Sequence, residues 1–526
     1  MLGNSSKLTQ ESGSSPIYAS PYFPLAFLVV VKLALHLFLN GTGGYGLFRD
    51  ELYYLACADH LAWGYVDHPP LSVFLLAAVR WVIGDSLFAI RLLPAFAGAA
   101  LVLVTGLLAR QLGGGRWAIF LAGLASLVAG ANLALASFWS MNIFDLLLTA
   151  IAVLLLARLL ASGERKYWVW LGIVLGLGLL NKVGVLWIGL GLAVSLICSR
   201  QRHWFAGPWP WVSGLLAGGL FLPYVLWNAS HDWAHLEFIG EATTGKYSGL
   251  SAWTFLQGLV LGENPATLVI WMVGLGWLLL SREAQRYRPL GILWLTAFGV
   301  LLANGHSKAG YLAPAFVIVF AAGGVAWEGI ARRSRPRFQR ILIPTLTVLV
   351  ASGAILAPFA VPLLPVETFI RYAAALGIEP GTDEGHELAE LPQFYADMFG
   401  WEEKAAAVAE VFRALPEEER QMAGFFTSNY GRAGAIDYWS ETYGLPKARS
   451  THNNYWLWGP GDLSPEVVVV LGGEREDLER RFESVELAGT ASCDYCIPYE
   501  DDLPIYVCRH LRLEVEELWA VAKHYD

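Results

Sequence analysis

Three charged residues, Arg49, Asp50 and Glu51, follow directly after the first long apolar run of the chain. Charged side chains beside a membrane helix are costly because lipid offers them no water, so charges placed there usually have a function. A carboxylate next to a bound hydroxyl group acts as a general base. Arginine and lysine bind phosphate through charge and hydrogen bonds. The cluster therefore predicts proton-transfer or phosphate chemistry at the end of a membrane helix.

The composition identifies a polytopic integral membrane protein. Of the 526 residues, 55% are hydrophobic and only 15% are charged, whereas a soluble globular protein has about 25% charged residues. The mean hydropathy is +0.46. The net charge of −9 arises mainly after Val366 and gives no indication of nucleic-acid binding.

Runs of roughly 17–25 apolar residues, shorter inside a bundle, predict membrane-spanning helices. Eleven such spans are expected, at about 22–40, 87–108, 117–137, 142–160, 167–181, 183–198, 211–228, 264–281, 289–303, 309–329 and 341–360. The segment 167–198 could instead be one kinked helix. Leu71 to Ile83 follows Pro69-Pro70 and is too short for a span, so we expect an interfacial helix there.

The charges between these spans predict the orientation. With residues 1–20 as a disordered cytoplasmic tail, the loops on the inner side hold fifteen Lys and Arg residues and those on the outer side hold six. Cytoplasmic loops carry the excess of positive charge. Asp50 and everything after Pro362 are therefore expected on the periplasmic or extracellular face of a bacterial plasma membrane.

The chain changes character near residue 360, which predicts a transmembrane domain at 21–360 and an external domain at 361–526. The run Val467–Leu471 and the segment Ile505–Val507 read as strands, and helical patterns at 402–415 and 474–482 alternate with them. A small α/β domain fits this pattern best. Three cysteines lie in this domain, and a disulfide among them is expected with its connectivity open: Cys493, Cys496 and Cys508.

Polar residues recur at the outer ends of the expected spans. Besides the first cluster these are Tyr53, Asp67, His68, Asp145, Lys182, Glu263, His306, Lys308 and Tyr311. Structural explanations remain open for several of them: a neighbouring helix could satisfy Asp145, Lys182 could extend to the interface, and Arg49 could pair with its acidic neighbours. His231 and His235 could bind a metal, but a plain polar loop is favoured because no third ligand is evident.

Together these residues predict a site that holds both a proton acceptor and a phosphate. Asp50 and Glu51 supply carboxylates for general-base chemistry. Lys182, Lys308 and Arg49 supply positive charge for a phosphate. This combination fits group transfer from a membrane-embedded phosphate carrier to a hydroxyl group outside.

The order of these motifs resembles the bacterial family 39-like glycosyltransferases of the GT-C superfamily, which includes protein O-mannosyltransferases and lipid A aminoarabinose transferases. The resemblance covers roughly residues 20–330. It rests on Arg49-Asp50-Glu51-Leu52-Tyr53-Tyr54, Asp67-His68-Pro69-Pro70-Leu71, Phe144-Asp145-Leu146-Leu147, Asn181-Lys182 and Lys308-Ala309-Gly310-Tyr311. In the tail, Tyr430–Tyr438 and His452–Gly459 also look like members of this group.

The resemblance implies a GT-C fold and an inverting transfer of a sugar from a polyprenyl-phosphate donor to a cell-envelope glycan, lipopolysaccharide or protein acceptor. It implies Asp50 as the base, Glu51 as its acidic neighbour, and Lys182, Lys308, Arg49 and His68 at the donor phosphate. His68-Pro69-Pro70 departs from the Lys-Pro of the aminoarabinose transferases. The remaining candidates would line the substrate pocket: Asp67, Asp145, Tyr53, Tyr311, His306 and Glu263.

This mechanism requires no metal, although a divalent cation near Asp50 or Asp67 stays open. Two other classes compete with the glycosyltransferase. A transporter or flippase for lipid-linked sugars would use Lys32 and Asp145 as a pathway, but the chain lacks repeat symmetry. A non-enzymatic assembly or export subunit would leave the outer polar residues without a chemical role.

Overall fold

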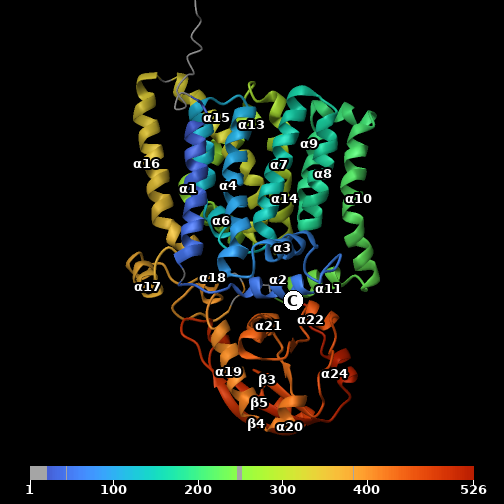
Figure 1. The fold of residues 1–526 in the computed structure, drawn as a ribbon. Helices are drawn as coiled ribbons and strands as arrows, with labels where there is room; N and C mark the ends of the chain where they lie inside the picture. Colours follow the sequence, from blue (N-terminus) through green and yellow to red (C-terminus); the bar gives the residue numbers. More distant parts are fainter. Residues whose placement is uncertain (1–19, 43, 246–250, 334, 383, 385) are drawn as a thin grey trace, which may run out of the picture.

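The computed structural model describes residues 20–42, 44–245, 251–333, 335–382, 384 and 386–526. Lys246 and nearly all of the expected N-terminal tail lie outside these ranges. Figure 1 shows an upright bundle of helices with a smaller domain packed against one end. We call this end of the bundle the domain face and the other end the opposite face.

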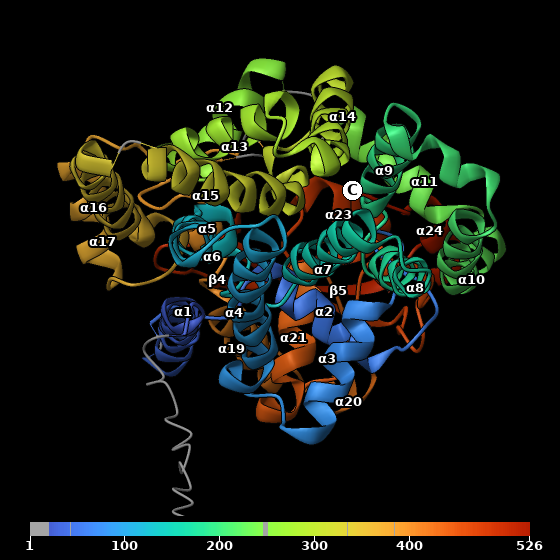
Figure 2. The ribbon, with the colours of Figure 1, turned by 90° about the horizontal axis from the view of Figure 1, so that it is seen from above.

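Each of the eleven expected spans contains a helix of the bundle. They are α1 (Phe23–Thr42), α4 (Leu87–Gln111), α5 (Arg116–Val128), α7 (Met141–Ser162), α8 (Lys166–Asn181), α9 (Val185–Ile197), α10 (Trp209–Ser230), α13 (Leu268–Leu280), α14 (Arg288–Asn304), α15 (Phe316–Arg333) and α16 (Arg335–Ala360). Helices α10 and α16 lie on opposite sides of the bundle when it is seen from above (Figure 2). The segment 167–198 forms two helices, and the expected span 117–137 breaks into α5 and the short α6 (Gly130–Ala134).

Not all of these eleven helices are long enough to cross a membrane on their own. Within the described residues, six are long and apolar enough to cross a membrane alone, and a bent pair raises the number to seven. That pair joins α12 (Ala252–Gly262) to α13 with an 89° bend. Helix α12 was not expected, because the segment before α13 reads as an external loop; α11 (Ala234–Thr244) also lies there. The other four expected spans are the shorter helices α5, α8, α9 and α14.

Two helices lie at the domain face between the bundle and the smaller domain (Figure 1). Helix α2 (Arg49–Asp59) carries the charged cluster in its first turn, and α3 (Leu71–Val82) packs beside it. At the end of α3, Trp81 is 88% exposed and Val82 is exposed too. Aromatic and apolar side chains of this kind are typical of a helix that rests in the membrane interface.

The smaller domain is built on a five-stranded sheet with the order β2-β1-β3-β5-β4. Its strands are β1 (Gly424–Phe426), β2 (Ala448–Arg449), β3 (Val467–Leu471), β4 (Phe482–Ala491) and β5 (Leu503–Leu511). Strands β2, β1 and β3 are parallel, and β3, β5 and β4 are antiparallel. All five residues of β3 are buried, as a continuous apolar run predicts for a central strand.

Helices surround this sheet and connect it to the bundle. Helices α19 (Trp401–Ala414) and α23 (Arg475–Arg481) agree with the helical patterns read from the sequence. The others are α17 (Val366–Ala375), α18 (Gln393–Ala396), α20 (Glu417–Met422), α21 (Tyr430–Tyr443), α22 (Asn454–Leu457) and α24 (Val515–Val521). A disulfide joins Cys493 to Cys496, and Cys508 is a buried free thiol.

Helix α21 packs closely on α2, and two glycines make this approach feasible. A Cβ atom at Gly434 would lie 2.9 Å from the backbone carbon of Leu52, and one at Gly431 would lie 2.7 Å from Cγ of Arg49. Residues of both helices share one buried apolar cluster, to which Leu52 and Ile436 contribute. The charged first turn of α2 is therefore held between the helix bundle and the smaller domain.

Candidate functional site

Asp50 and Glu51 are neighbours in the first turn of α2, yet their side chains have opposite surroundings. Successive residues of an α-helix point about 100° apart, because 3.6 residues make one turn. The Asp50 side chain is 39% exposed, whereas Glu51 is completely buried. Only Asp50 is therefore open to a small molecule.

Asp50 is oriented by two side chains. The hydroxyl of Tyr430, from α21, donates a hydrogen bond to Asp50 Oδ1 at 3.0 Å. Nε of Arg49 lies 3.7 Å from the same oxygen, and the Arg49 guanidinium lies 5.8 Å from the ring centre of Tyr430. The carboxylate is thus fixed on one side and exposed on the other, as a proton acceptor requires.

Glu51 is bound in a structural network away from this position. Its oxygens accept hydrogen bonds from Arg91 Nη2 at 2.6 Å, from the Trp139 amide at 2.7 Å and from the Phe48 amide at 2.9 Å. The last bond satisfies an amide at the start of α2 that has no partner within the helix. The structure does not bring Glu51 to Asp50's exposed side, because its carboxylate is enclosed by Arg91, Trp139 and Phe48.

Arg49 connects Asp50 to a second set of charges. Its Nη1 donates to the Tyr499 hydroxyl at 3.0 Å and lies 3.7 Å from Asp397 Oδ1. Its Nη2 lies 3.4 Å from Glu384 Oε2, and the other oxygen of Glu384 lies 3.4 Å from Nζ of Lys308. Glu384 thus bridges two of the cations assigned to a phosphate. Asp397 is buried, and this burial raises the pKa of its carboxyl to about 6.

Lys182 lies at the C-terminal end of α8 and interacts with the start of α7. Its Nζ donates to Asn142 Oδ1 at 2.7 Å and lies 3.8 Å from Asp145 Oδ2. The ammonium also lies 5.2 Å from the ring centre of Tyr311, three residues after Lys308. Asp145, Lys182 and Tyr311 therefore lie together, and Lys308 is three residues before Tyr311 in the chain.

Tyr53, Asp67 and His68 form a third group beside Asp50. The Tyr53 hydroxyl donates to Asp67 Oδ1 at 2.8 Å, and its ring packs against Tyr430 with centroids 4.7 Å apart. His68 is fully buried and stacks on Tyr54 at 4.6 Å. Its Nε2 lies 3.9 Å from Asp67 Oδ1. This burial between aromatic rings places His68 behind Asp67, without a contact to the described cations of the site.

Two expected pocket residues lie apart from these groups. His306 is exposed. Glu263 is buried at the bend between α12 and α13. His231 and His235, the alternative metal pair, contact backbone carbonyls of Trp227 and Val66.

Tyr430, Glu384 and Asp397 belong to the charged network but were not predicted as site residues. Tyr430 begins a tail motif that carried the resemblance, so its sequence context was a usable signal. Glu384 and Asp397 lie between α17 and α19, where no periodic pattern or motif marks them.

The ligand groups available for a metal lie elsewhere. In the part of the chain that the structure describes, two groups of His, Cys, Asp or Glu are close enough to hold an ion: His452, His524 and Asp526, and Cys493, Cys496 and Asp501. Neither contains Asp50 or Asp67, near which a divalent cation was left open.

The chain resembles known proteins in part of its sequence and over nearly its whole fold. Residues 67–227 match the model of the dolichyl-phosphate-mannose-protein mannosyltransferase family. The structure of ArnT from Cupriavidus metallidurans bound to undecaprenyl phosphate is 13% identical, with a TM-score of 0.61 over 92% of this chain and 97% of that one. The oligosaccharyltransferase of Archaeoglobus fulgidus is 15% identical, with a TM-score of 0.50 over 80% of this chain and 64% of that one.

None of the curated proteins matches the chain. The family match and the structural similarities confirm the resemblance recognised in the sequence motifs. The chain shares the membrane-helix fold of ArnT, with a small sheet domain at its C-terminal end.

Proposed function

We propose that this protein is an inverting glycosyltransferase that moves a sugar from a polyprenyl-phosphate donor to a hydroxyl group of an acceptor. The acceptor is a cell-envelope glycan, lipopolysaccharide or protein on the periplasmic or extracellular side. The observation that carries the proposal is the partly exposed Asp50, held beside a row of cations. Two of these cations, Arg49 and Lys308, share an anionic partner, Glu384.

In the proposed reaction the acceptor oxygen attacks the anomeric carbon of the donor sugar. Asp50 removes the proton of the acceptor hydroxyl as the new carbon–oxygen bond forms. The bond between the anomeric carbon and the phosphate oxygen breaks, and its electron pair leaves with polyprenyl phosphate. This leaving group needs no general acid, because Lys308 and Arg49 stabilise its charge.

The position of Glu384 supports the assignment of the phosphate site. Its two carboxylate oxygens each meet one cation, at 3.4 Å. A phosphate presents its oxygens in a similar way and binds strongly to Arg and Lys. The donor phosphate would take the place of the Glu384 carboxylate, with Lys182 nearby beside Tyr311.

Two further observations favour an enzyme with this class of donor. The ArnT structure, which shares the fold, binds undecaprenyl phosphate. A transporter for lipid-linked sugars, the alternative function, requires no carboxylate oriented by a tyrosine and an arginine at the end of the bundle.

The excess of Lys and Arg in the loops of the opposite face supports a cytoplasmic location for that face.

Binding of undecaprenyl phosphate tests the donor site without knowledge of the sugar or acceptor. Lys308→Met and Lys182→Met in lipid nanodiscs should each weaken binding by about 10- to 100-fold, because hydrogen bonds to charged groups contribute about 1.5–3 kcal/mol. Lys166→Met is the matched control, since Lys166 pairs with Glu164 at the opposite face. Equal affinities of all three variants and the wild type would show that these cations do not hold the phosphate.

Glu384→Gln should have the opposite effect on the same binding. The neutral amide no longer competes as an anion for Lys308 and Arg49, so we expect undecaprenyl phosphate to bind about two- to fivefold more tightly. Glu387→Gln is the control, because Glu387 is an exposed carboxylate three residues further along the chain. Weaker binding by the Glu384→Gln variant would mean that Glu384 stabilises the bound donor and does not compete with its phosphate.

A further inference from the structure

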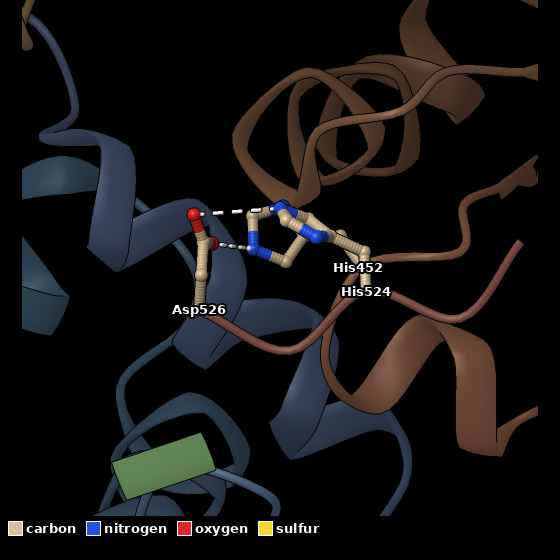
Figure 3. A group of neighbouring side chains, drawn as sticks. All are labelled: His452, His524 and Asp526. Carbon is tan, nitrogen blue, oxygen red and sulfur yellow. Dashed lines mark ion pairs between the residues drawn. The ribbon is translucent and has the colours of Figure 1, made fainter. Parts of the chain in front are cut away.

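His524 and Asp526 form a compact group with His452, a buried histidine of the smaller domain. His452, His524 and Asp526 direct their polar atoms toward one another (Figure 3). Nε2 of His452 lies 2.5 Å from Asp526 Oδ1, and Nε2 of His524 lies 3.4 Å from Oδ2. One ligand atom from each of the three residues lies within 4.8 Å of the others. The three side chains are therefore close enough to share one ion.

We propose that these three residues bind a divalent transition-metal ion of the zinc type. Two imidazole nitrogens and one carboxylate oxygen match the three protein ligands of open zinc sites. In such a tetrahedral site the ligand atoms lie about 3.3 Å apart, since each is about 2.0–2.1 Å from the ion. Magnesium and calcium are disfavoured because they select oxygen ligands.

The backbone holds the ligands in this arrangement. His452 and His524 form an isolated parallel bridge, in which the His524 amide donates to the Thr451 carbonyl at 3.0 Å and the Asn453 amide donates to the His524 carbonyl at 2.9 Å. The Asn453 side chain also bonds to both backbone groups of Asp526, at 3.1 and 3.2 Å. These bonds fix two segments that are far apart in the sequence.

A strained residue lies between the ligands. Asn453 has a φ of +48°, a region that most residues other than glycine avoid. Such conformations persist where surrounding contacts enforce them, and they are frequent at ligand sites. The His452 side chain beside it is only 6% exposed, whereas the His524 side chain is 55% exposed. The site is thus rigid on its inner side and accessible to an ion from outside.

The proposed ion would fix residues 524–526 beside the Asp50 network. The His452 ring packs against Tyr430 with centroids 4.7 Å apart, and Tyr430 donates to Asp50. His452 would thus act on Asp50 only through Tyr430, as a positioning residue. The metal site itself does not depend on the proposed glycosyl transfer, so it is tested by metal content alone.

The test uses the full chain with an N-terminal affinity tag that contains no histidine. The protein is loaded with Zn²⁺, dialysed without reductant so that the Cys493–Cys496 disulfide persists, and analysed by mass spectrometry of its metal content. We expect one zinc per chain in the wild type and almost none in His524→Ala and Asp526→Asn. Loss of a residue that hydrogen-bonds to a metal ligand weakens metal affinity by about 10- to 100-fold. Loss of a ligand itself should therefore weaken the affinity further.

The matched control is His510→Ala. His510 forms an exposed pair with Glu466 at 2.9 Å in the same domain, so this variant removes an equivalent histidine from outside the site. It should retain one zinc per chain. Cobalt substitution should give tetrahedral absorption bands in the wild type and in this control only. Equal zinc content in His510→Ala and His524→Ala, or none in the wild type, would overturn the proposal and leave a plain ion pair.

Discussion

Asp50→Asn is expected to reduce glycosyl transfer by about 10²- to 10⁴-fold, the usual contribution of a general acid or base. The amide keeps the shape of the carboxylate and can still accept the hydrogen bond of Tyr430, but it cannot take the proton of the acceptor. Binding of undecaprenyl phosphate should persist, because Arg49, Lys308 and Lys182 are unchanged. Transfer is measured in proteoliposomes that contain undecaprenyl-phosphate-linked sugars.

Asp59→Asn is the control for this experiment. Asp59 lies at the other end of α2, with a side chain that is 43% exposed against 39% for Asp50. It pairs with Arg80 at 2.6 Å, outside the group of cations around Asp50. We expect nearly full transfer from this variant. If Asp50→Asn also retains full transfer, another group removes the proton and the mechanism proposed for Asp50 is wrong.

Glu51→Gln should destabilise the protein by about 3–5 kcal/mol, the typical effect of removing one partner of a buried ion pair. Arg91 would keep its charge in a buried position, where only 4% of its side chain is exposed. The amides of Phe48 and Trp139 would also lose a charged acceptor. The change is measured by thermal unfolding in detergent, followed by tryptophan fluorescence.

The control substitution is Glu164→Gln, which removes an exposed carboxylate paired with Lys166 at the opposite face. It should leave the unfolding temperature almost unchanged, because exposed ion pairs contribute little. A Glu51→Gln variant of normal stability that has lost transfer would contradict the structural role. Glu51 would then act in the chemistry, as its place beside Asp50 in the sequence suggests.

Apolar segment length predicted the bundle well, because lipid requires long apolar helices and leaves few alternatives. The prediction was weakest where a span is interrupted. Helix α12 was missed since its eleven residues are short and followed by Glu263. The 89° bend at this point lies at Asn264, whose φ is +67°, and Pro265; these residues mark a break in the helix, but their sequence does not give its angle.

The sequence predicted which residue types gather at the domain face. It did not predict that the Asp50 side chain is partly exposed while that of Glu51 is buried. Glu51 pairs with Arg91, forty positions further along the chain, and the local sequence does not indicate this contact. Glu384 reaches Arg49 across 335 positions. The ligands His452 and His524 are likewise brought together only by the fold. The spacing of residues along the sequence identifies such groups only when all their members lie on one helix or strand.

The close packing of α21 on α2 also determines when the site can be assembled during synthesis. The bond between Tyr430 and Asp50 joins residues 380 positions apart. A ribosome that adds about 5–20 residues per second needs roughly 20–80 s to cover this distance. During this interval α2 is already made, but the glycines that fit against it are not. A chain that stops short of α21 therefore contains a bundle in which Asp50 lacks the hydrogen bond of Tyr430.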